Sequence, residues 1–224
     1  ARLHTAAAML PGVPPLTGVS DGVTRRIARA RELLERPWCR RRPPPRPGAE
    51  PFAARLEQAV AIFAAADGDR AVAAAAAARV PEVRLQTVLR DVWSAHVLFR
   101  SDVAPGVAGI VDPHAAGVDT PAADLARLLG SWRGSESSAN LSDVWPEALA
   151  AYDAVRPLAA AERGLVPFLH AAGVVCGLDN WFRWTLDEGR AFADEAAATH
   201  RIDRLLGDLP AALAWLADRP KIRV

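Results

Sequence analysis

Residues 89–99 read Leu-Arg-Asp-Val-Trp-Ser-Ala-His-Val-Leu-Phe. Its Asp91 follows one apolar run, and His96 directly precedes another. A further apolar run, residues 107–111, ends directly before Asp112. All three polar side chains therefore flank short strands that we expect to be buried. A polar group held at the end of a buried strand can face a cleft in a fixed orientation, so we expect the chemistry of the protein here.

Helical patterns lie on both sides of this stretch. Apolar residues recur at helical spacing over residues 1–80, interrupted by an Arg- and Pro-rich run at 40–48 that predicts a loop. β-prone runs replace them over residues 81–120, and helical patterns fill residues 121–224. We therefore expect one mainly helical domain over residues 1–224 with a small β insertion. This α+β pattern differs from the regular alternation of a doubly wound sheet.

The same periodicities place the individual elements. The predicted helices cover residues 3–10, 23–35, 51–66, 70–79, 122–132, 144–155, 159–172, 180–188, 191–206 and 210–216. The predicted strands cover residues 83–89, 97–99 and 107–111.

The charge balance of the chain argues against several classes of protein. There are 27 basic and 26 acidic side chains, and a net charge of +1 gives no electrostatic basis for binding nucleic acid or an anionic membrane surface. The single lysine of the sequence is Lys221, close to the end. Walker-type phosphate loops, Schiff-base enzymes and kinase nucleotide sites each need a lysine in an ordered site. We do not expect this chain to supply one.

Cysteine usage and hydropathy favour a cytoplasmic protein. Cys39 and Cys176 are far apart and form no C-x-x-C pair, so neither a zinc knuckle nor a disulfide framework is indicated. No run approaches 18 apolar residues without a charged or turn-forming residue, which predicts no membrane span. The first four residues also lack the apolar core of a signal peptide.

The order of chemical groups in the middle third resembles two segments of a known family. Asp91 is followed five residues later by His96, then by an apolar strand, a hairpin, a second apolar strand and Asp112. This order is similar to the catalytic loop, His-x-Asp-x-x-x-x-Asn, and the metal-binding Asp of the aminoglycoside phosphotransferase and choline kinase-like family, which has the protein-kinase-like fold. The resemblance covers residues 80–132. It implies that Asp91 is the catalytic base and that His96 and Asp112 bind the metal.

The resemblance implies further residues and ligands. Asp124 and Arg90 would support the loop, and Trp93, two residues after the base, is a candidate wall of an acceptor pocket. The implied cofactors are ATP or GTP together with Mg²⁺, and the implied partner is a small molecule with an acceptor hydroxyl. Three positions depart from the family pattern: Leu89 replaces the His, His96 replaces the Asn, and Pro113 follows Asp112.

A kinase-like fold also needs a part that this chain lacks. That fold has an N-terminal lobe with a β-sheet, a phosphate-covering loop and a nucleotide lysine. Here a mainly helical pattern precedes Asp91, and the first residue, Ala1, is not a methionine. We therefore expect the C-terminal lobe of a longer phosphotransferase whose N-terminal lobe belongs to the same polypeptide. We expect the chain alone to be inactive.

The residues leave two other classes of function open. The departures from the family pattern are also compatible with a kinase-like binding protein that has lost its chemistry. A metal-dependent hydrolase would hold an activated water with His96, His114, Asp91 and Asp112. Tightly bound zinc, manganese or iron would favour the hydrolase, and weakly bound magnesium the kinase. The remaining histidines are expected at the surface or in packing contacts: His4, His170 and His200.

Overall fold

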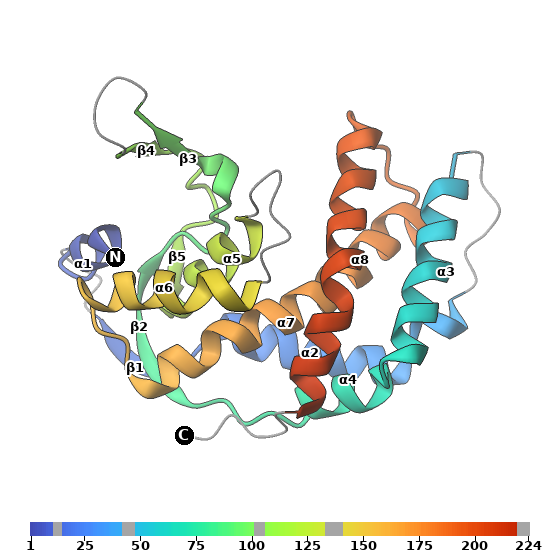
Figure 1. Cartoon of the computed structure of the whole chain (residues 1–224), viewed down its shortest axis with the longest axis horizontal. Coiled ribbons are helices and arrows are strands. Elements are labelled where there is room, and N and C mark those ends of the chain that lie inside the picture. Colours follow the sequence, from blue (N-terminus) through green and yellow to red (C-terminus); the bar gives the residue numbers. More distant parts are fainter. Residues whose placement is uncertain (11–14, 42–47, 101–105, 133–140, 219–224) are drawn as a thin grey trace. The chain divides into compact units, whose positions relative to one another are not determined.

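The computed structural model describes residues 1–10, 15–41, 48–100, 106–132 and 141–218. Most of the loop predicted at 40–48 lies outside these ranges. The described chain is mainly helical with small antiparallel sheets, as the sequence predicts (Figure 1). It divides into two compact units. The first unit contains Ala1–Val23 and Val80–Leu169, and the second contains Thr24–Arg79 and the described residues from His170 onward. The single domain expected over residues 1–224 stays a prediction.

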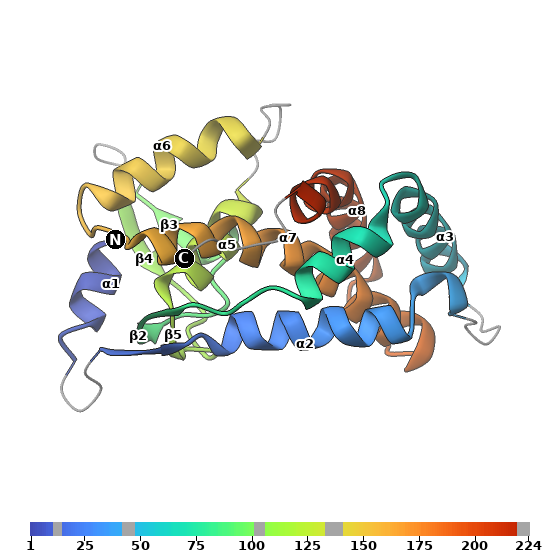
Figure 2. The same ribbon diagram turned by 90° about the horizontal axis from the view of Figure 1, so that it is seen from below.

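Two antiparallel sheets belong to the first unit (Figure 2). In one sheet, β2 (Glu82–Val88) lies between β1 (Leu16–Val19) and β5 (Gly117–Asp119). In the other, β3 (Val97–Phe99) pairs with β4 (Val107–Ile110) as a hairpin. Val83 and Leu85 of β2 are buried whereas Glu82 and Arg84 are exposed, the alternation of a strand with one covered face.

The strands β1 and β5 are absent from the sequence-based prediction. The sequence of β1 is Leu-Thr-Gly-Val, in which glycine disfavours a strand and most residues are exposed. The sequence of β5 is only three residues long. Both strands form by pairing with β2, to which β1 is distant in sequence, and such non-local pairing leaves little pattern in the short strands themselves.

Helices of the first unit are α1 (Arg2–Ala7), α5 (Pro121–Ser131), α6 (Leu141–Asp153) and the first part of α7 (Ala160–Phe182). The beginning of α5 is fixed by caps. Thr120 Oγ1 accepts a hydrogen bond from the amide of Ala122 at 3.4 Å. Asp119, at the end of β5, is buried and accepts from Ser20 Oγ at 2.5 Å, from the Gly22 amide at 3.0 Å and from the Thr120 amide at 2.8 Å.

Helices make up the second unit: most of α2 (Asp21–Glu35), η1 (Trp38–Arg40), α3 (Glu50–Ala65), α4 (Gly68–Ala76), the rest of α7, the π-helical turn η3 (Arg183–Asp187) and α8 (Glu195–Asp218). The helices predicted separately at 191–206 and 210–216 are wrong as two elements, because α8 continues through Pro210. The stripe of Leu206, Leu209 and Leu213 is buried on both sides of this proline, and its packing offsets the backbone hydrogen bond that proline removes.

The break predicted between residues 172 and 180 is also wrong. α7 continues through Gly173 and Gly177, and the adjoining Val174, Val175 and Leu178 are buried. Glycine weakens the local helical preference, but the burial of the apolar side chains around it stabilises the helix.

One helical stretch has the length and composition of a membrane span. It covers Ala160–Asp187, with a mean hydropathy of 1.2 over the tested window, and 61% of that window is buried within the fold. A mostly buried core helix passes the same test, so this stretch is weak evidence for a span. The absence of a membrane partner stays a prediction.

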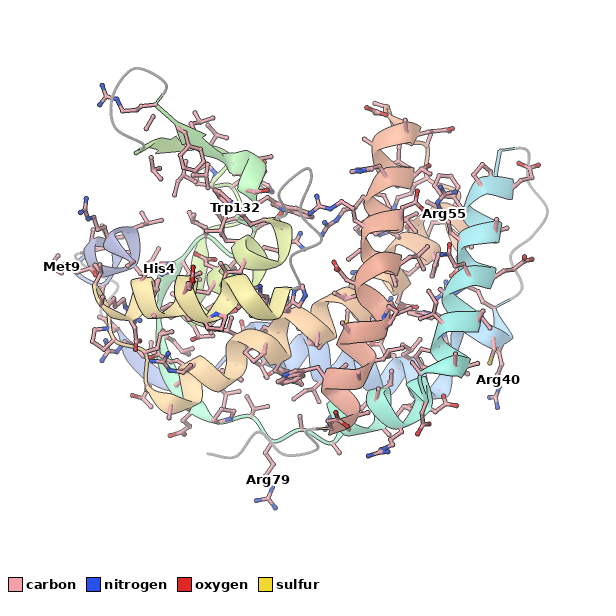
Figure 3. The ribbon with its side chains drawn as sticks, viewed as in Figure 1. His4, Met9, Arg40, Arg55, Arg79 and Trp132 are labelled. Carbon is pink, nitrogen blue, oxygen red and sulfur yellow. The ribbon has the colours of Figure 1, made fainter. Side chains whose placement is uncertain are left out.

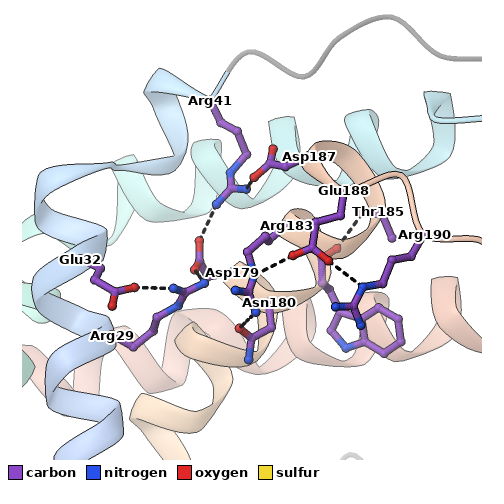
Figure 4. A network of polar contacts seen from close by, with 11 residues as sticks. Arg29, Glu32, Arg41, Asp179, Asn180, Arg183, Thr185, Asp187, Glu188 and Arg190 are labelled. Atoms are coloured by element: carbon purple, nitrogen blue, oxygen red, sulfur yellow. Dashed lines mark hydrogen bonds and ion pairs between the residues drawn. The ribbon is translucent and has the colours of Figure 1, made fainter.

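Asp179 of α7 contacts three side chains of the second unit. Its carboxylate, only 7% exposed, forms ion pairs with Arg29 at 2.7 Å and with Arg41 at 2.6 Å (Figure 4), and it accepts a hydrogen bond from the indole of Trp38 at 3.1 Å. Arg29 also pairs with the exposed Glu32. A buried carboxylate of this kind is stabilising only while its partners remain, because removing one side leaves buried charges unpaired.

We predict that Asp179→Ala destabilises the second unit by about 3 kcal/mol, because the indole of Trp38 loses its acceptor and Arg29 and Arg41 each keep only one more exposed carboxylate partner, Glu32 and Asp187. Denaturant unfolding followed by circular dichroism measures this loss. Glu32→Ala is the matched control, since Glu32 is 59% exposed and its ion pair should contribute less than about 1 kcal/mol. Equal effects of the two substitutions would contradict the central role of Asp179.

Candidate active site

The loop between β2 and β3, residues 89–96, carries the predicted base. β2 ends at Val88, and the chain then turns sharply, since Arg90 has a φ of 65° and the Asp91 amide donates to the Leu89 carbonyl at 2.8 Å. A short 3-10 helix, η2 (Ser94–His96), leads into β3. A left-handed backbone is uncommon for a residue with a side chain, so contacts around the loop must hold it.

Asp124, in the first turn of α5, supports this turn. Its buried carboxylate accepts from the amide of Leu89 at 2.8 Å and from the amide of Arg90 at 2.7 Å. It also accepts from Nε2 of His4, labelled in Figure 3, at 2.9 Å, and Nδ1 of that ring lies 2.8 Å from the hydroxyl of Tyr152. One carboxylate thereby satisfies two amides that no strand partner takes.

Asp91 is held through a single oxygen. Its Oδ1 accepts hydrogen bonds from Nε of Arg127 at 2.9 Å and from the indole of Trp93 at 2.7 Å, and it lies 2.7 Å from Nη2 of Arg127 in an ion pair. The Arg127 guanidinium lies 3.8 Å from the centre of the Trp93 ring. Partial burial raises the pKa of Asp91, but the Arg127 charge and the hydrogen bonds from Arg127 and Trp93 outweigh it, so this pKa lies below its usual value.

Ser131, at the end of α5, binds the loop at Ser94. Its Oγ accepts from the amide of Ser94 at 2.8 Å, and its carbonyl accepts from the Ser94 hydroxyl at 3.0 Å. Asp124, Arg127 and Ser131 are spaced i, i+3 and i+7, so they share one face of α5. Successive residues along this face bind successive residues of the loop: Asp124 binds the amides of Leu89 and Arg90, Arg127 binds Asp91, and Ser131 binds Ser94.

His96 and Asp112 approach each other across the second sheet. Nδ1 of His96 lies 3.1 Å from the carbonyl oxygen of Asp91, and because a carbonyl can only accept, this nitrogen carries the proton. The lone pair of neutral His96 is then on Nε2, which lies 3.9 Å from Oδ2 of Asp112. Asp112 has a φ of 59°, its side chain is 52% exposed, and its Oδ1 lies 2.5 Å from Nδ1 of His114.

This donor set fits a divalent cation that substrate phosphates also bind. Two neighbouring ligands of an octahedral magnesium ion lie about 3 Å apart, so His96 and Asp112 would have to close by about 1 Å. No group of three or more possible metal ligands occurs in the part of the chain that the structure describes. Nucleotide phosphates and water would have to complete the coordination. The nitrogen donor also suits manganese better than magnesium.

The structure thus brings Asp91, His96 and Asp112 to one end of the first unit's strands. Arg90 lies at the same place, and its guanidinium donates to the carbonyl of Val118 in β5 at 2.7 Å. Trp93 also lies beside Asp91, although Arg127 covers one face of its ring. The roles assigned to these residues by resemblance stay predictions.

The sequence-based prediction does not include Arg127 or Ser131 in the site, and it assigns His4 only a surface or packing position. The sequence does contain a pattern that points to Arg127 and Ser131. They follow Asp124 by three and seven residues in an otherwise largely apolar helix, so the three polar side chains share one face. The contact of His4 with Asp124 joins residues 120 positions apart and has no local signal.

We predict that Asp124→Asn loosens the loop, because the amides of Leu89 and Arg90 bind different carboxylate oxygens and the NH2 group that replaces one oxygen cannot accept a hydrogen bond. Leaving one buried amide unsatisfied costs about 1–3 kcal/mol, so hydrogen exchange of residues 89–96 should accelerate about tenfold or more. Mass spectrometry of exchanging peptides measures this rate. Glu82→Gln, on the exposed side of β2, should leave it unchanged. An unaltered loop in Asp124→Asn would show that other contacts hold the turn.

Comparison with known proteins identifies one family. The family model described as the phosphotransferase enzyme family matches residues 2–158, which is more than half of the chain and includes the loop, both sheets and α5. Neither the curated proteins nor the solved structures contain a match. The family implies a protein-kinase-like fold and a small-molecule acceptor, and its kinases typically use ATP and Mg²⁺. The resemblance predicted from the sequence is therefore confirmed, and the chain belongs to the phosphotransferase enzyme family.

Proposed function

We propose that this chain is the C-terminal lobe of a kinase that transfers the terminal phosphoryl group of ATP or GTP to a hydroxyl group of a small molecule. The observation that carries the proposal is the juxtaposition of Asp91 with the His96–Asp112 pair, linked by the hydrogen bond between the Asp91 carbonyl and His96. A base and a pair of metal ligands on neighbouring strand ends are what phosphoryl transfer requires.

Asp91 orients the acceptor hydroxyl. Its Oδ1 already accepts two hydrogen bonds and is paired with the Arg127 charge, whereas Oδ2 makes no hydrogen bond to the described residues and is the oxygen available to the hydroxyl. A carboxylate with a lowered pKa is a weak base, so it removes the proton late in the reaction. This suits a loose transition state, in which little charge develops on the attacking oxygen.

Asp112 and His96 would hold the divalent cation, which would neutralise the charge of the nucleotide phosphates. The hydrogen bond from His96 Nδ1 to the Asp91 carbonyl leaves Nε2 directed at Asp112, the usual arrangement of a metal-binding histidine. A hydrolase centred on His96, His114, Asp91 and Asp112 receives less support, because Asp91 is bonded to Arg127.

The groups that bind the nucleotide would come from an N-terminal lobe of the same polypeptide. Residues 1–220 contain no lysine. The β3–β4 hairpin also exposes large apolar side chains, with Leu98 46%, Phe99 53% and Val107 58% exposed. An exposed apolar face of this kind suits contact with a further part of the protein.

We predict that Asp91→Asn lowers phosphoryl transfer by about 10²- to 10⁴-fold in the intact protein, because the acceptor hydroxyl loses its proton acceptor. The assay follows ADP release from ATP with Mg²⁺ or Mn²⁺ in the presence of pooled hydroxyl compounds. Nucleotide affinity, measured by calorimetry, should stay within about threefold, because Asp91 does not contact the phosphates in this scheme. Glu82→Gln serves as the control. Turnover equal to the wild type in Asp91→Asn would exclude the proposed base.

We also predict that Asp112→Asn weakens binding of the metal–nucleotide complex by about tenfold or more, because a neutral amide replaces the carboxylate ligand. Calorimetric titration with MnATP measures this affinity. Binding of MnATP by the wild type that Asp112→Asn leaves unchanged would place the cation elsewhere. Absence of metal–nucleotide binding by the intact wild-type protein would favour the binding protein that has lost its chemistry.

A further inference from the structure

We infer that Arg127 is a positioning residue of the transfer reaction: it fixes one oxygen of Asp91 so that the other faces the acceptor hydroxyl. This inference rests on the proposed function. It concerns a residue on α5, 36 positions from the base, that acts through the base and does not itself touch the reacting atoms.

The contacts of Asp91 with Arg127 and Trp93 all fall on one oxygen. Nε of Arg127 donates a hydrogen bond to Oδ1 of Asp91 at 2.9 Å, and Nη2 of the same guanidinium lies 2.7 Å from that oxygen. The indole of Trp93 donates to that oxygen as well, at 2.7 Å. Rotation of the carboxylate would break these two hydrogen bonds and the ion pair. The carboxylate plane, and with it the direction of Oδ2, is therefore fixed.

Arg127 is itself held by Trp93. The guanidinium lies 3.8 Å from the centre of the Trp93 ring, a stacking distance, so Trp93 orients both members of the pair. The planar guanidinium can stack on the ring and donate to the carboxylate at the same time. The ammonium of a lysine cannot do so, because it is a compact charge without a plane.

Residues other than Arg127 support the backbone of the loop. Asp124 already binds the backbone of the loop before Asp91, and Ser131 binds the backbone of Ser94 after it. Arg127 makes its contacts with the side chains of Asp91 and Trp93. Removing Arg127 should therefore release the carboxylate and leave the path of the loop unchanged.

Steady-state kinetics of Arg127→Gln in the intact protein tests the inference. We expect kcat to fall about 10- to 100-fold while KM for MnATP stays within about twofold, because misorientation affects the chemical step and not nucleotide binding. The acidic limb of the pH–rate profile should move to higher pH, since the charge that lowers the pKa of Asp91 is removed. Arg127→Lys should recover the pH profile more fully than kcat, because it restores charge without stacking.

Two controls make the result decisive. Arg163→Gln removes another Arg–Asp ion pair of the first unit, with Asp153, and should leave kcat unchanged. Hydrogen exchange of residues 89–96 should match the wild type in Arg127→Gln, and faster exchange accompanying the loss of kcat would overturn positioning in favour of a structural role. A wild-type kcat in Arg127→Gln would overturn the role of Arg127 alone. No transfer by the wild type, with any nucleotide or pooled acceptor, would overturn the proposed function itself.

Discussion

The buried carboxylate of Asp124 is the constraint on which the site depends. The left-handed turn at Arg90 points two successive amides away from any strand partner, and each would cost about 1–3 kcal/mol if it were buried without an acceptor. Asp124 accepts both, from the first turn of a helix, where a negative charge is favoured by the helix dipole. The direction of the chain after β2 is therefore set by the position of α5.

The position of α5 is in turn set from its other side. Asp119 at the end of β5 binds Ser20 and the amide of Gly22, and it also binds the amide of Thr120, the N-cap of α5. Two buried aspartates, five residues apart, thus join the beginning of one helix to three separate segments of the first unit. The face of α5 formed by Asp124, Arg127 and Ser131 then binds successive residues of the loop and so determines its path.

Local patterns explain which parts could be predicted from the sequence. The helices α2, α3 and α5 and the strands β2, β3 and β4 fall within two residues of their predicted ends, because their apolar periodicity is complete within each segment. β1 and β5 could not be found, since their register depends on β2. The breaks expected in α7 and α8 failed because burial of apolar side chains outweighs the local effect of glycine and proline. In the site, Asp91, His96 and Asp112 lie in a recognisable order, whereas Arg127 looks like any charged residue on a helix until the face shared with Asp124 is known.

Asp91 links the two halves of the proposed chemistry through different atoms of one residue. Its side-chain oxygen is fixed by Arg127 and Trp93, which sets the orientation of the proposed base. Its backbone carbonyl accepts from Nδ1 of His96, which sets the tautomer of the proposed metal ligand. An asparagine would bind a metal through its amide oxygen and would not need this tautomer control. With histidine at this position, the proposed metal ligand depends on the same turn that orients the proposed base, so any contact that holds residues 89–96 in place acts on both.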